Sequence, residues 1–303
     1  LAETQWRYKN PAETIFEIQH AWSLTGTQYN GNVAAIMMPS HNGDGVFDGV
    51  PLKGYGTTMP GWSSLRANNR YAIFRPATGN TKTENETYID ALFNPLPLTY
   101  DTYDASLNRY TVKIDMEALA AGEIRGRKID RRVQYYLGLG DLETGATFNI
   151  TNRYGVPWPG PKFWCPDIEQ NYDSNNYRIF RYADAILMMA ECYCNLENAD
   201  EAMRYLNLVR DRAGVDPVTN FTGFEDLTLA IRCERARELG GEFQRKFDLV
   251  RWGIWYDQTY AYTNNSTLKG KMRPCHRYYP IPDAQCALSG YVLTNDEYLA
   301  DGL

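Results

Sequence analysis

An amphipathic pair of helices constrains the fold of this chain more than any other feature of the sequence. Two sets of apolar residues recur at the spacing of one helix face: Ala183, Ile186, Leu187, Ala190 and Cys194, then Ala202, Leu206, Val209 and Ala213. Asn198 and Asp200 separate the sets, and Gly214 is the residue type favoured just after a helix. The segment from Arg181 to Gly214 is about 34 residues long, the length of one tetratricopeptide repeat.

Small and aromatic residues stand where helices of such a repeat pack closely. With Ala183 as position one, Ala190, Tyr193, Ala202 and Leu206 occupy positions eight, eleven, twenty and twenty-four. Position four is isoleucine instead of an aromatic residue, so a coincidental amphipathic hairpin is the alternative.

A second helical hairpin is predicted further along the chain. It comprises a helix over 226–239, a break at Gly240 and Gly241, and a helix over 243–255. Charges of alternating sign in the first helix, over 232–238, indicate an exposed face whose side chains form a solvated or interhelical ion network. We expect Arg181 and Asp184, in the first hairpin, to pair with Asp248 or Arg251, because buried charges on helices are normally matched.

The first half of the chain predicts short strands and long loops. Thr14–Gln19 alternates like a half-buried strand, and 132–137 and 146–150 are further candidate strands. A loop is expected over 39–61, and three prolines within 156–161 exclude regular structure there.

The fold class is therefore mainly α, with tetratricopeptide-like hairpins joined to irregular loop-rich and short β parts. We expect three regions: an irregular part over 1–160, the helical hairpins over 161–260 and a loop-rich C-terminal segment over 261–303. Because stacked helical repeats usually need at least three units, further hairpins are expected from a segment before Leu1.

Composition limits the partners. The net charge of −6 argues against nucleic acid, because phosphate binding needs an excess of Lys and Arg. Aromatic residues make up 14% of the chain, with 23 Tyr and 7 Trp, which is more than a core of this size requires. Many rings are therefore expected in loops, where they suit recognition of sugars or peptides, although a Tyr-rich surface without one ligand is the alternative.

One loop region combines the side chains that sugar recognition needs. Trp62 and Tyr55 are the candidate stacking platforms, with Arg66, Asn68 and Asn69 as hydrogen-bonding partners for hydroxyl groups. The same aromatic residues would also suit packing beneath long loops.

A second candidate binding surface is the proline-rich segment, because proline lowers the ordering cost of a binding loop. It carries Trp158 and Trp164. Their alternative role is to fill the junction between the irregular and helical parts.

Neither a metal site nor a cofactor site is predicted. Asn42, Asp44 and Asp48 bear a faint likeness to a calcium loop, but their spacing departs from the EF-hand pattern and no Glu stands at position twelve. Calcium is retained only as a minor alternative. If any disulfide forms, Cys275 with Cys286 is the pair that the sequence favours.

No catalytic residue is predicted either. The three histidines are scattered, and the sequence contains no GxSxG, HExxH or P-loop motif. A glycosidase needs only two carboxylates, so a carbohydrate-active hydrolase is the rival hypothesis.

Taken together, five segments in order resemble the SusD/RagB-like family. They are Asn10–Gln19, Lys128–Arg132 (without the family's proline), Arg181–Glu191 followed by Tyr205–Asn207 and Val209–Gly214, Arg232–Leu239 with Phe247–Gly253, and Tyr279–Pro282. The resemblance implies an extracellular lipoprotein of a Bacteroidetes-type bacterium that caps a SusC-like TonB-dependent transporter and captures a glycan or, in some members, peptides. It implies no enzymatic activity.

The implied location is the outer face of the outer membrane. Family members are anchored through a lipidated N-terminal cysteine, and no such cysteine stands in LAETQWRYKN at the start of this chain. The resemblance thus predicts an anchor, and an N-terminal part of the same protein, outside these residues.

Overall fold

The computed structural model describes residues 12–20, 31, 46–47, 50–51, 98–104, 109–114, 117, 121–124, 126–128, 130, 132, 175–263 and 266–303. They belong to two units, Leu1–Glu242 and Phe243–Leu303. The candidate strand over 146–150, most of the one over 132–137 and the proline-rich segment lie outside the described residues. The three regions expected from the sequence remain a prediction.

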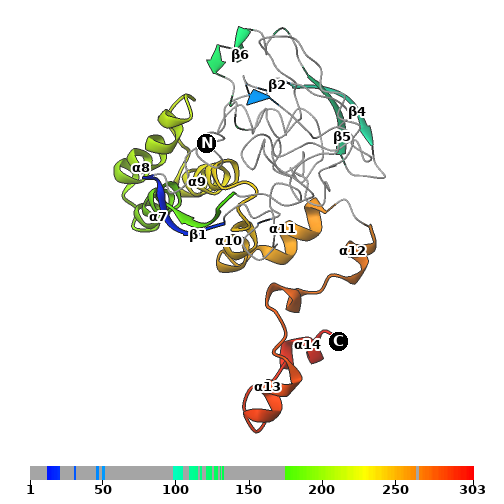
Figure 1. Ribbon diagram of the computed structural model, residues 1–303. Helices are drawn as coiled ribbons and strands as arrows, with labels where there is room; N and C mark the ends of the chain where they lie inside the picture. Colours follow the sequence, from blue (N-terminus) through cyan, green and yellow to red (C-terminus); the bar gives the residue numbers. More distant parts are fainter. Residues whose placement is uncertain are drawn as a thin grey trace. The chain divides into compact units, whose positions relative to one another are not determined.

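The described strands pair antiparallel in twos. β1 (Thr14–Ile18) lies against β8 (Tyr177–Arg181), which is far away in sequence (Figure 1). The other pairs are local: β2 (Val46–Phe47) with β3 (Val50–Pro51), β4 (Leu98–Asp104) with β5 (Arg109–Ile114), and β6 (Glu123–Ile124) with β7 (Arg127–Lys128). The β1–β8 pair therefore fixes the segment around Glu13 beside α7 (Tyr182–Asn195), where Tyr182 N donates to Glu13 O at 2.8 Å.

β1 confirms the expected strand but not its expected buried face. Ile15, Phe16 and Ile18 are all about half exposed, whereas Glu17 is turned inward and accepts a 2.6 Å hydrogen bond from Asn176 Nδ2. The pairing register shifts on both sides of Phe16, which breaks the simple alternation of faces.

Three helices of the first unit follow the predicted pattern: α7 (Tyr182–Asn195), α8 (Ala199–Arg212) and α9 (Phe224–Glu238). Asn198 caps α8, because its Oδ1 accepts from Glu201 N at 3.3 Å. Gly214 has a φ of +69° after α8, and Val215 N beyond it donates to Arg210 O at 3.1 Å. The glycine end of the hairpin is thus confirmed.

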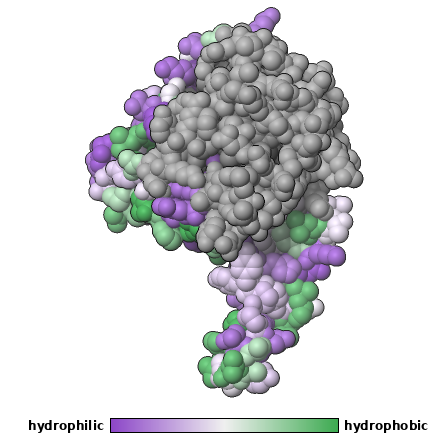
Figure 2. All heavy atoms as spheres, viewed as in Figure 1, coloured by the Kyte–Doolittle hydropathy of each residue, from purple (hydrophilic) through white to green (hydrophobic). Residues whose placement is uncertain are grey.

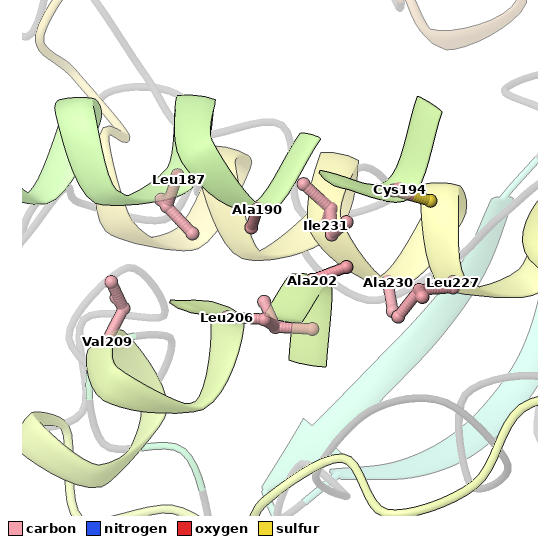
Figure 3. Packing of buried hydrophobic residues seen from close by; sticks show 9 residues of the cluster. All are labelled: Leu187, Ala190, Cys194, Ala202, Leu206, Val209, Leu227, Ala230 and Ile231. Carbon is pink, nitrogen blue, oxygen red and sulfur yellow. The ribbon is translucent and has the colours of Figure 1, made fainter. Parts of the chain in front are cut away.

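The apolar core lies where α7, α8 and α9 meet (Figure 3). Its nine buried residues are Leu187, Ala190, Cys194, Ala202, Leu206, Val209, Leu227, Ala230 and Ile231. Ala190 and Ala202 leave room for α7 and α8 to approach, and the rings of Tyr193 and Tyr205 stack with centroids 5.6 Å apart. The repeat positions read from the sequence therefore form the expected interface.

The second unit is a series of short helices. They are α10 (Arg245–Arg251), α11 (Trp255–Tyr262), α12 (Ser266–Lys271), the 3-10 helix η3 (Pro274–Arg277), α13 (Asp283–Leu288) and α14 (Asp296–Ala300). The single helix predicted over 243–255 is wrong, because Gly253 adopts a φ of +71° and ends α10. Ile254 N then donates to Leu249 O at 3.0 Å and closes that end. None of the described helices of either unit has the length and apolarity needed to cross a membrane.

Side-chain bonds hold the end of the second unit together. Asn295 donates to Ile281 O at 2.9 Å and accepts from Ile281 N at 2.8 Å, and Asp301 accepts from Cys275 N at 2.7 Å. Cys275 and Cys286 are separate buried free thiols, so the disulfide favoured by the sequence is not formed. Exposed apolar side chains gather around α13 and the turn after it, at the foot of the view in Figure 2.

The core predicts a sharp contrast between two leucines of α8. Leu206 is fully buried, whereas the Leu208 side chain is 47% exposed. Leu206→Ala should lower the free energy of unfolding by about 2–5 kcal/mol, because it removes packed atoms and leaves a cavity. Leu208→Ala, the matched control, should change it by about 0.5 kcal/mol or less. Urea unfolding followed by circular dichroism measures both, and equal effects would contradict this core.

Candidate functional site

The binding and metal residues expected from the sequence lie outside the described residues. They are Trp62, Tyr55, Arg66, Asn68, Asn69, Trp158 and Trp164 for the ligand, and Asn42, Asp44 and Asp48 for the minor calcium alternative. Their roles stay predictions. Among the residues that the structure describes, no three His, Cys, Asp or Glu side chains gather to hold a metal ion.

Among the described residues of the first unit, a dense cluster of charged side chains lies along one face of α9. Glu234 and Glu238 stand one helical turn apart, and both side chains are essentially inaccessible to solvent. Arg132 bridges them, with 2.6 Å to Glu234 and 2.8 Å to Glu238. Arg210 of α8 reaches Glu234 from the other side at 2.8 Å.

Arg181 extends this cluster to the start of the chain. Its guanidinium, 1% exposed, lies 2.6 Å from Glu13, 2.6 Å from Glu238 and 2.8 Å from Glu242. Arg212 joins Glu13 to Glu238 at the outer edge. We call this set, together with Asp130 beside Arg132, the buried ion network.

Two expectations about these charges are corrected. Asp184 pairs with Arg235 of α9 at 2.7 Å, and Asp248 pairs with its neighbour Arg251 at 3.0 Å. The expected pairing of Arg181 and Asp184 with 248 or 251 is therefore wrong. The charges of α9 do form an interhelical network, but Glu234, Arg235, Arg237 and Glu238 are buried, so the exposed face is wrong as well.

The network keeps its carboxylates ionised. Burial alone would raise the pKa of Glu238, but the guanidinium groups of Arg181, Arg132 and Arg212 outweigh it and hold that pKa well below the usual glutamate range. Arg132 lowers the pKa of Asp130 in the same way against the effect of burial. A general acid must carry a proton near neutral pH, so these carboxylates are unsuited to that role. Their arrangement fits a structural function.

A second cluster, of lysine and aromatic side chains in the Phe243–Leu303 unit, faces solvent. Lys246 Nζ of α10 lies 3.9 Å from the ring centroid of Tyr279 and 5.7 Å from that of Trp255. The rings then continue along α11, from Trp255 to Tyr256 with centroids 6.5 Å apart, and on to Tyr260 at 5.8 Å. Lys269 Nζ of α12 ends the series 4.5 Å from the Tyr260 ring. We call these six residues the cation–aromatic ladder.

The ladder is open to a ligand at its ends. Tyr279 is 74% exposed and Tyr260 43% exposed, and Lys246 and Lys269 are partly exposed beside them. Rings of this kind stack on the C–H faces of sugars, and ammonium groups bind anions. The sequence analysis missed this surface, because its residues are scattered over 34 positions and only the short helices bring them together.

Known proteins match the part of the chain that contains these helices. Residues 166–298 match the SusD family. SusD-like protein P25 of Formosa agariphila is 34% identical over 152 residues, which cover 45% of this chain and 27% of that protein. SusD-like protein P38 of the same organism is 34% identical over 98 residues, which cover 30% of this chain and 20% of that one. The matches thus span only about a quarter of these curated relatives.

A solved structure agrees with the fold. The crystal structure of a SusD homolog from Bacteroides thetaiotaomicron superposes with a TM-score of 0.55 at 15% identity, covering 96% of this chain and 53% of that one. The class is thus that of helical proteins with the SusD fold. Residues 166–298 match the SusD family, in agreement with the SusD/RagB-like resemblance found in the sequence.

The buried ion network predicts a loss of stability in acid. Because the pKa of Glu238 is lower in the folded protein than the ordinary value of 4.5, its contribution is complete above that pH and is lost as the pH falls toward the folded value. Glu238→Gln should lower the free energy of unfolding by about 3–5 kcal/mol at neutral pH, because it leaves buried guanidinium charge uncompensated.

Urea titrations over a pH series check this. The wild-type protein should lose stability below pH 4.5, and the Glu238→Gln variant should lose less over the same range. The control, Glu201→Gln, removes one partner of the surface pair with Arg204 and should leave the stability almost unchanged, because solvent screens an exposed ion pair. Parallel pH profiles for the wild type and Glu238→Gln would contradict the role of the network.

Proposed function

We propose that this protein is a non-catalytic binding protein that captures an oligosaccharide or polysaccharide at the bacterial cell surface. The observation that carries the proposal is the SusD-family region over residues 166–298, which includes the helical hairpins and most of the second unit. The exposed rings and ammonium groups of the ladder add side chains of the type that glycan recognition uses.

The chemistry of the charged residues supports binding without catalysis. The buried carboxylates Glu234 and Glu238 are each engaged by guanidinium groups. A glycosidase would need one carboxylic acid protonated and a second carboxylate beside it across the sugar. The ion network offers neither a proton nor a space for a sugar.

We further propose that the captured glycan passes to a SusC-like, TonB-dependent transporter of the outer membrane. This protein would lie on the extracellular face and cap that transporter. An N-terminal part of the same protein would supply the lipid anchor. No cofactor is required for capture, since stacking and hydrogen bonds suffice.

Native gel electrophoresis in gels containing candidate polysaccharides tests the function. Retarded migration with no release of reducing ends from the same polysaccharides is the expected result. Released reducing ends would replace the proposal with a carbohydrate-active hydrolase. Retention by peptides, with no glycan affinity, would replace it with a peptide-binding member of the family.

The predicted loop platform has its own test. Trp62→Ala should weaken glycan binding by about 1 kcal/mol or more, because a stacking ring is lost. Isothermal titration calorimetry measures this with the glycan that the gels identify, and an unchanged melting temperature shows that the variant is folded. Affinity equal to that of the wild type would remove Trp62 from the site.

A further inference from the structure

One segment of the second unit has a charge opposite to that of the chain as a whole. From Arg245 to Tyr279 the sequence holds seven Lys or Arg residues and only two acidic residues, Asp248 and Asp257, a local excess of five positive charges in a chain of net charge −6. No continuous basic run marks this segment, because short helices and turns separate the cations. The fold brings these residues into one unit.

Carboxylates neutralise only part of this charge. Asp248 lies 3.0 Å from Arg251, and Glu297 of α14 lies 2.8 Å from Arg277. Asp301, also at the end of the chain, accepts from Cys275 N and faces Arg273 and His276 electrostatically. The contacts of the ladder lysines are of a different kind, since both side chains lie over aromatic rings.

A lysine held over a ring keeps its positive charge while the ring restrains its position. Lys246 is held between Trp255 and Tyr279, and Lys269 is held over Tyr260. A cation with restrained position loses less entropy when an anion binds. The ladder therefore presents two positioned ammonium groups, joined by a continuous series of rings.

We propose that the cation–aromatic ladder binds anionic sugar residues, those bearing carboxylate or sulfate groups. The proposal rests on the proposed glycan-binding function and names its ligand class. Rings stack on the apolar faces of pyranoses while Lys246 and Lys269 pair with the charged substituents. A neutral glycan uses the rings alone, so charge on the sugar raises affinity.

Affinity gels with matched polymers test the proposal on the full chain. Dextran and dextran sulfate share a backbone and differ in charge, and polygalacturonate supplies carboxylate in place of sulfate. We expect stronger retention by at least one anionic polymer than by dextran, weakening as salt is added. The polymer that retains the protein distinguishes carboxylate from sulfate recognition.

Charge variants localise the site. Lys246→Gln with Lys269→Gln should weaken retention by the anionic polymer about five- to tenfold. The control double variant, Lys128→Gln with Arg204→Gln, removes the same charge from the first unit, where both side chains are exposed, and should retain wild-type binding. Tyr279→Ala should also weaken retention, which a surface acting through charge alone would not show.

The outcomes separate this proposal from the proposed function. Retention by neutral glycans with no preference for anionic ones overturns the ligand class and leaves glycan binding intact. Equal loss in the two double variants overturns the ladder as the site. Equal affinity for single-stranded DNA or anionic vesicles overturns recognition of sugars. Failure to bind any glycan, neutral or anionic, overturns the proposed function together with this inference.

Discussion

The cost of burying a guanidinium group without a partner governs how the first unit is assembled. Arg181 and Arg210 are almost completely removed from water, and an isolated charge in that position would be strongly unfavourable. α9 answers this requirement with Glu234 and Glu238, so its charged face turns inward against α7, α8 and the segments around 13 and 132. The apolar core packs the three helices together. The ion network then attaches the distant segments that carry Glu13 and Arg132.

The second unit places cationic side chains in a different environment. In the first unit, guanidinium groups meet carboxylates away from water and the charges cancel within the protein. Around α10, α11 and α12, lysines lie over partly exposed rings, which attract a cation without neutralising it. The buried arginines are therefore structural, whereas the lysines over exposed rings form a surface that can bind a ligand.

Periodicity in the sequence was sufficient to predict the helical hairpin and its contacts, because Ala190, Ala202 and Leu206 interact with neighbours on nearby helices. It wrongly predicted an exposed charged face for α9, because alternating charges give the same pattern whether they contact water or buried partners. Those partners are also distant in sequence: Arg132 and Glu13 are more than 100 residues from Glu238 and Arg181. The break at Gly253 depends on one positive φ inside a continuous apolar pattern.

The ladder was missed because it exists only after short helices place Lys246, Tyr260 and Lys269 together. The predicted loop platform around Trp62 lies outside the described residues.

The separation of Glu13 from its partners bears on how the protein is made. Arg181 and Arg212 follow Glu13 by 168 and 199 residues. At a synthesis rate of about 5–20 residues per second, roughly 10–40 seconds pass between the synthesis of Glu13 and that of Arg212. Until β8 (Tyr177–Arg181) has been synthesised, Ile15 and Phe16 have no partner strand. A nascent chain of this kind must stay unaggregated, through chaperone binding or its own solubility, until about two thirds of it has been translated.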